Sequence, residues 1–153
     1  EIKKRLDKTI LILSSDTGSS YLNSDGTTLD KISAKMAMLL VQQNTTLTPI
    51  EAEEITSSKK GSEYRGRALP LMKVISKNEK DKLINVYLNI YSGEVTAIRS
   101  MQWKIWDVMW GFHIMDWQER DNIDNLFLKI FSILALVSSI TGILLFFKID
   151  FKK

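Results

Sequence analysis

The chain has 153 residues, of which 44% are hydrophobic and 25% are charged, with no cysteine and only two prolines. This composition excludes an intrinsically disordered chain and a small protein held together by disulfides. The absence of cysteine also excludes Cys-ligated zinc sites and iron–sulfur clusters. The formal net charge of +3 is not gathered into a dense basic stripe, which argues against nucleic-acid binding.

The first part of the chain predicts short strands followed by a helix. Residues 8–22 alternate weakly between apolar and polar side chains around a turn at residues 16–18, which indicates two strands. Apolar residues then recur at three-four spacing over residues 29–43, the pattern of an amphipathic helix. Thr27 or Thr28 is expected to cap the start of that helix.

A second short helix is predicted over residues 48–56. Thr48 is a good N-cap residue, Pro49 suits the first helical position, and Glu51 stands at the third position, where it completes a capping box.

Three strands are expected to follow as an antiparallel meander. Two apolar stretches, residues 68–76 and 83–91, are separated by the short charged loop 77–82, and a third strand covers residues 95–98. A helix followed by an antiparallel sheet is an α+β arrangement, which we expect for a domain over residues 1–100.

All four tryptophans and the single histidine follow the sheet at steps of three and four residues. This spacing places them on one stripe of a helix in an amphipathic segment, residues 101–125, just before the most apolar part of the chain. Tryptophan favours the headgroup region of a bilayer, so the stripe indicates either a membrane-interface belt or a surface for a partner or cofactor. Its members are Trp103, Trp106, Trp110, His113 and Trp117.

His113 has two interpretations. As a structural residue it needs one hydrogen-bond partner, for which Asp116 or Asp107 is available. As a haem ligand it needs a second axial ligand from another subunit. No metal site is expected nearby: the acidic residues Asp116, Glu119, Asp121 and Asp124 suit a solvated turn, partly neutralised by Arg120.

A transmembrane helix is predicted over residues 126–148. Residues 130–147 are 18 consecutive uncharged residues, and at ~1.5 Å per residue they span roughly 27 Å, close to the thickness of the hydrocarbon core. Lysines follow this segment and carboxylates precede it, so the tail 149–153 is expected in the cytoplasm and residues 1–100 outside it. In a bacterium with two membranes, this is the inner membrane with a periplasmic domain.

Small side chains recur on the predicted transmembrane helix at spacings of three and four. Such a face lets a helix of another membrane protein approach closely, although small residues are also simply tolerated within membranes. The face consists of Ala135, Ser138, Ser139 and Gly142.

Two groups of motifs resemble a known family. The stretches Arg65-Gly66-Arg67-Ala68-Leu69-Pro70-Leu71-Met72-Lys73-Val74 and Val86-Tyr87-Leu88-Asn89-Ile90-Tyr91-Ser92-Gly93-Glu94-Val95 resemble the strand pairs of PepSY domains. The stretch Trp110-Gly111-Phe112-His113-Ile114-Met115-Asp116-Trp117, with Arg120-Asp121-Asn122 and Ser139-Ile140-Thr141-Gly142-Ile143-Leu144-Leu145, is similar to membrane-associated PepSY proteins.

The resemblance implies an extracytoplasmic α+β domain beside a transmembrane helix. Relatives of this kind accompany reductases that move electrons across the inner membrane, and some ligate haem through histidines in several membrane helices. This chain shows one histidine and one such helix, so it cannot complete a bis-histidine haem site alone.

The function expected from these observations is that of a membrane-anchored, non-catalytic accessory or scaffold subunit. Its partners would be the lipid bilayer and other membrane subunits, reached through the transmembrane helix and the PepSY-like domain, and any haem or flavin would belong to a partner. No nucleophile, phosphate loop or dinucleotide motif is evident. The alternatives are a redox subunit that contributes His113 to a haem or flavin site, and a regulator of a periplasmic peptidase.

Overall fold

The structure is a computed structural model that describes residues 1–6, 8–15 and 18–150, with side chains described as far as Lys148. The predicted turn at residues 16–18 and the tail 149–153 therefore fall largely outside the described residues. The chain divides into two compact units, Glu1–Lys104 and Ile105–Lys153. The division falls four residues beyond the expected end of the α+β domain, inside a helix.

The first unit starts with a small antiparallel sheet. Its strands are β1 (Ile2–Arg5), β2 (Lys8–Ser15) and β3 (Gly18–Asn23), in that spatial order. The two strands predicted within residues 8–22 are confirmed as β2 and β3, and β1 is an additional strand. Ile10, Ile12 and Leu29 form its core.

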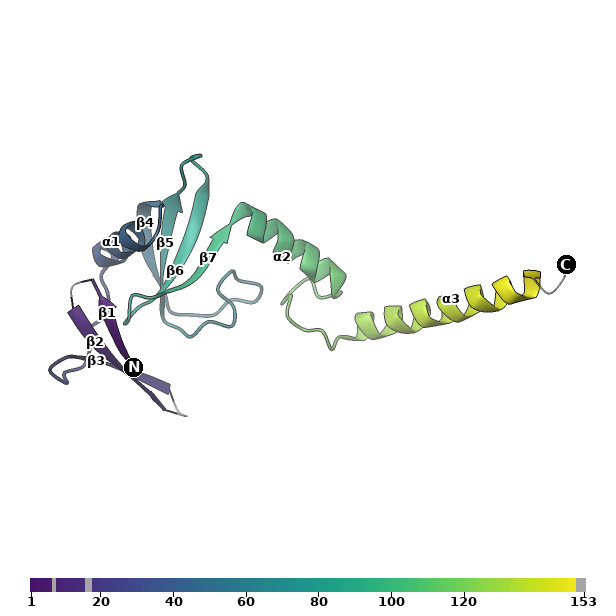
Figure 1. Ribbon diagram of the computed structural model, residues 1–153, viewed down its shortest axis with the longest axis horizontal. Helices are drawn as coiled ribbons and strands as arrows, with labels where there is room; N and C mark the ends of the chain where they lie inside the picture. The colour runs from purple at the N-terminus through teal and green to yellow at the C-terminus, as the bar shows by residue number, and fades with distance from the viewer. Residues whose placement is uncertain (7, 16–17, 151–153) are drawn as a thin grey trace. The chain divides into compact units, whose positions relative to one another are not determined.

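A second, four-stranded antiparallel sheet carries the main core of this unit. The order is β4 (Thr48–Ile55), β5 (Leu71–Lys77), β6 (Leu83–Asn89) and β7 (Val95–Ser100), which confirms the predicted meander in β5–β7. Helix α1 (Ala34–Asn44) lies against one face of this sheet (Figure 1). Val74, Val86 and Leu88 from the sheet meet Leu40 and Val41 of α1 in the buried cluster.

The predicted helix over residues 48–56 is wrong, because this segment is strand β4. It pairs with β5 from Thr48↔Lys77 to Ile55↔Leu71, with an irregularity between Pro49 and Glu51. An edge strand accepts proline, since only one side of its backbone needs ladder hydrogen bonds. The ladder with β5 therefore outweighs the local capping pattern.

The helix predicted over residues 29–43 is confirmed in its second half but starts later. It begins at Ala34, after Ser33, whose hydroxyl accepts from the backbone N–H of Met36 at 3.2 Å. The expected caps Thr27 and Thr28 are wrong, and Thr28 instead forms a β-bridge with Leu22. The preceding residues 29–33 form no regular secondary structure and place Leu29 and Ile32 in two different core clusters.

Two further helices complete the α+β fold. Helix α2 (Met101–His113) follows β7 directly, and the hydroxyl of Ser100 accepts from the N–H of Trp103 at 3.3 Å. Helix α3 (Leu126–Asp150) is the long apolar helix. Within it, Leu126–Lys148 is long and apolar enough to cross a membrane, with a mean hydropathy of 2.5 and no buried residues.

Candidate functional site in the corner before helix α3

Helix α2 ends in a left-handed turn. Met115 has a φ of 57°, the N–H of Asp116 donates to the carbonyl of Gly111 at 2.9 Å, and the N–H of Met115 donates to that of Phe112 at 3.3 Å. These two bonds form a Schellman motif, a common way to end a helix. Trp117 therefore lies beyond α2, so the prediction of one helical stripe through Trp117 is wrong.

Gly111 allows the chain to fold back onto α2. A Cβ atom at this position would lie 2.9 Å from the carbonyl oxygen of Asp116 and 3.1 Å from Cγ of Arg120. Real Cβ atoms are not found so close to a backbone oxygen, so the return of the loop requires glycine here.

A buried ion pair lies beneath this loop. Nη1 of Arg120 donates to Oδ2 of Asp107 at 2.7 Å, and Asp107 is only 1% exposed. Arg120 has a φ of 61°, a left-handed conformation that costs a non-glycine residue about 1 kcal/mol or more. The bond to Asp107 helps to hold it there. In addition to the surface acids near it in the sequence, Arg120 thus has an interior carboxylate, that of Asp107, as an ion-pair partner.

Asp116 organises the loop between the two helices. Its carboxylate oxygens accept backbone N–H groups from Gln118, Glu119, Asp121 and Asn122, at 3.0–3.3 Å. Burial alone would raise the pKa of Asp116, but these backbone hydrogen bonds outweigh it and the pKa is lowered. This carboxylate therefore stays ionised and orders the loop.

Asn125 connects the end of α2 to the start of α3. Its Oδ1 accepts from the N–H of Leu128 at 2.9 Å, which caps α3, while its Nδ2 donates to the carbonyl of Ile114 at 2.7 Å. A neighbouring ion pair joins Lys129 to Asp124 at 2.6 Å. We call residues 105–129, with these contacts, the corner before α3.

Aromatic rings line the corner. Trp106 stacks on Trp110 with ring centroids 5.9 Å apart. Trp117 contacts Phe112 at 6.2 Å and Phe127, in the first turn of α3, at 6.0 Å. These aromatic side chains are exposed, and Trp117 joins them from the loop after α2.

Trp103 belongs to the other unit and has a different environment. The guanidinium carbon of Arg99 lies 4.1 Å from its ring centroid and that of Arg65 lies 5.8 Å away. These are cation–π contacts. Trp103 therefore packs against side chains of the α+β unit, although it shares helix α2 with Trp106 and Trp110.

His113 is exposed at the last turn of α2. Its ring lies 5.7 Å from that of Trp110. The carboxylates expected to hold it serve other groups: Asp107 binds Arg120, and Asp116 binds the loop backbone. Among the described side chains, no three histidines, cysteines or acids come together as a possible metal site.

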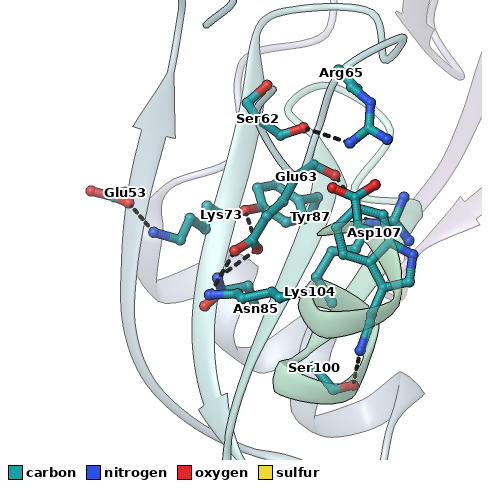
Figure 2. A network of polar contacts seen from close by, with 12 residues as sticks. Glu53, Ser62, Glu63, Arg65, Lys73, Asn85, Tyr87, Ser100, Lys104 and Asp107 are labelled. Atoms are coloured by element: carbon teal, nitrogen blue, oxygen red, sulfur yellow. Dashed lines mark hydrogen bonds and ion pairs between the residues drawn. The ribbon is translucent and has the colours of Figure 1, made fainter. Parts of the chain in front are cut away.

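A polar network in the α+β unit centres on Glu63, a residue that no sequence motif singles out (Figure 2). One carboxylate oxygen accepts from Asn85 Nδ2 at 2.8 Å and from the hydroxyl of Tyr87 at 3.0 Å, and the other pairs with Lys104 Nζ at 2.7 Å. Burial would raise the pKa of Glu63, but these three donors lower it. The same burial, with the charge of Glu63, raises the pKa of Tyr87.

This network suits a structural role better than proton transfer. A general base works best with a pKa near the working pH. The contacts instead favour an ionised Glu63 and a protonated Tyr87. Arg99 Nε also donates to the carbonyl of Glu63 at 3.0 Å, so the group fastens residues 56–70 and the first turn of α2 to the sheet.

The small-residue face on α3 is solvent-exposed. All four residues of this face are exposed: Ala135, Ser138, Ser139 and Gly142. The hydroxyl of Ser139 donates a hydrogen bond to the carbonyl of Ala135 at 2.9 Å. A Cβ at Gly142 would meet nothing within 4 Å. The face is thus open to another helix.

Comparisons with protein-family models, with curated proteins and with solved structures gave no match to this chain.

Proposed function

We propose that the chain is a membrane-anchored, non-catalytic accessory subunit of PepSY type that binds other proteins of a bacterial inner-membrane complex, one that transfers electrons. The observation that carries this proposal is α3. Its segment Leu126–Lys148 is apolar and unburied throughout, a surface that is unfavourable in water and favourable in lipid. The motif resemblance at residues 65–95 and 110–145 supports the PepSY assignment.

The orientation proposed is a periplasmic α+β unit with the C-terminus in the cytoplasm. The support is the lysine at the far end of α3, Lys148, together with Lys152 and Lys153 in the sequence beyond it. A reporter that works only in the cytoplasm should be active when it is fused after Lys153. In spheroplasts, an external protease should cut at the exposed Lys59-Lys60. Protection of that site in intact spheroplasts, with cleavage after lysis, would contradict this orientation.

A partner helix is proposed for the face around Gly142. Leucine at this position would fill the groove while keeping the helix apolar, so Gly142→Leu should insert normally and lose its partner subunits. The measurement is co-purification in mild detergent, with Leu144→Phe, on another part of the surface, as the control variant. Identical co-purified subunits in wild type and Gly142→Leu would remove the argument for this face.

A second candidate function is a redox subunit that uses His113. The supporting observation is that its imidazole is exposed and lies against Trp110, within reach of a partner. The reduced-minus-oxidised spectrum of the purified assembly distinguishes the two functions. We expect His113→Gln to leave any visible band unchanged, whereas a haem band lost only in this variant would favour the redox function.

A further inference from the structure

An apolar pocket opens in the corner before α3. It is lined by Val108, Phe112, Trp117 and Arg120, and its volume is about 430 Å³. Pockets of roughly 300–1,000 Å³ are the usual size of small-molecule sites. Three of the four lining residues are apolar, so a ligand must be mostly apolar and must present one group that suits a guanidinium.

Arg120 is fixed in position while remaining accessible. The Asp107 carboxylate holds its Nη1 at 2.7 Å, yet 27% of the Arg120 side chain is exposed. The return of the loop over Gly111 brings Arg120 against α2. A planar guanidinium presents several donors in a fixed geometry that matches the oxygens of a phosphate.

The pocket wall continues onto the apolar helix. The ring of Trp117 contacts both Phe112, which also lines the pocket, and Phe127 in the first turn of α3. If α3 spans the bilayer, its first turn lies near the headgroups, where tryptophan is favoured. Trp117 therefore connects the pocket to the depth at which lipid phosphates are found.

We propose that this pocket binds one phospholipid of the outer leaflet. The lipid phosphate would bind Arg120, and the upper acyl chain would lie along Phe112, Trp117 and Phe127. This inference rests on the membrane anchoring in the proposed function.

The charges of the corner favour a zwitterionic headgroup. Residues 105–129 contain five carboxylates against Arg120 and Lys129 as the only cations. An anionic lipid would be repelled by this excess, whereas a phosphoethanolamine group adds an ammonium that the carboxylates attract. The ligand class is therefore phosphatidylethanolamine in preference to phosphatidylglycerol.

The experiment uses the full-length chain, purified in mild detergent and incubated with equal amounts of phosphatidylethanolamine and phosphatidylglycerol. Native mass spectrometry counts the lipids retained per chain. Val108→Phe adds a ring at a position that is 42% exposed, so it should fill the pocket without disturbing the core. Val137→Phe, at an exposed position of α3, is the matched control.

Wild type and Val137→Phe should each retain one phosphatidylethanolamine, and Val108→Phe should retain about tenfold less. Equal retention by both variants would overturn the pocket, and equal retention of both lipids would overturn the headgroup assignment. Crosslinking of position 108 to a protein subunit in place of lipid would also overturn the assignment of this pocket to a lipid. A wild-type chain that carbonate releases from membranes would instead contradict the anchoring itself.

Discussion

The α+β unit and helix α3 use the same apolar residue types in opposite ways. In the first, Val74, Val86 and Leu88 are fully buried between the sheet and α1. In the second, leucine, isoleucine and phenylalanine cover the helix on every side, and none is buried. One region thus carries its own interior, while the other relies on its surroundings to remove apolar surface from water.

The corner before α3, which follows the α+β unit in the sequence, has both a buried interior and an exposed apolar surface. Its interior is small and polar, built from the Asp107–Arg120 pair and the close contact at Gly111, while its outer surface is aromatic. A buried ion pair adds little net stability, but removing one partner leaves a costly charge. The corner is therefore suited to fixing how the chain enters α3.

The first large effect expected from this comparison is on membrane insertion, because it changes where the chain is found. Leu136 lies near the middle of α3, and arginine at the centre of a membrane helix costs about 2.5–3.5 kcal/mol on insertion scales. Leu136→Arg should move much of the chain out of the carbonate-resistant membrane fraction, whereas Leu136→Phe should stay. Equal retention of both variants would contradict the placement of residue 136 in the hydrocarbon core.

The next effect separates the two kinds of apolar surface by stability. Leu88→Ala removes a fully buried side chain and should lower the unfolding free energy of the α+β unit by about 2–5 kcal/mol. Leu134→Ala, at an exposed position of α3, should change it by less than about 0.5 kcal/mol. Denaturant unfolding in detergent, followed by near-UV circular dichroism, measures both. Similar losses in the two variants would contradict the division.

The sequence predicts α3 and β5–β7 correctly because the local pattern of apolar residues is sufficient for each of them. In α3 this pattern is a continuous apolar run, and in β5–β7 it is a series of short apolar stretches. Sequence reasoning failed where tertiary pairing competes with local signals. Residues 48–56 have a good helix start but gain more from the ladder with β5, and the chain before Ala34 stays non-helical and buries Ile32.

The candidate site was predictable only in part. The aromatic residues were identified from composition and spacing, but the helix end that separates Trp117 from α2 was not. Non-glycine residues such as Met115 rarely take a left-handed conformation, so no helix-stop signal is visible in the sequence there. The pairing of Asp107 with Arg120 and the network of Glu63 arise from folding over many residues, which no local pattern records.

A smaller effect on stability is expected when either of two glycines, Gly111 or Gly142, is replaced by alanine. Gly111→Ala places a Cβ 2.9 Å from a backbone oxygen and should cost about 1–3 kcal/mol, as overpacking does. Gly142→Ala meets open space and should be neutral or slightly stabilising, because alanine favours helix. Hydrogen exchange at residues 116–122 should accelerate only in Gly111→Ala. Unchanged exchange there would mean that the loop does not pack against α2 as described.

The smallest effect concerns the charge of Glu63 and depends on pH. Because its pKa is lowered in the folded chain, the unfolded chain binds the proton more readily, and the ionised form favours folding. This contribution is complete above the ordinary glutamate pKa and is lost as the pH falls through the lowered folded value.

Glu63→Gln breaks the ion pair to Lys104 and should cost about 1 kcal/mol at pH 7. The difference from wild type in denaturant unfolding should shrink below pH 4, while Glu79→Gln, at an exposed loop position, should match wild type throughout. A difference that stays constant down to pH 3 would show that the carboxylate charge is not what stabilises this network.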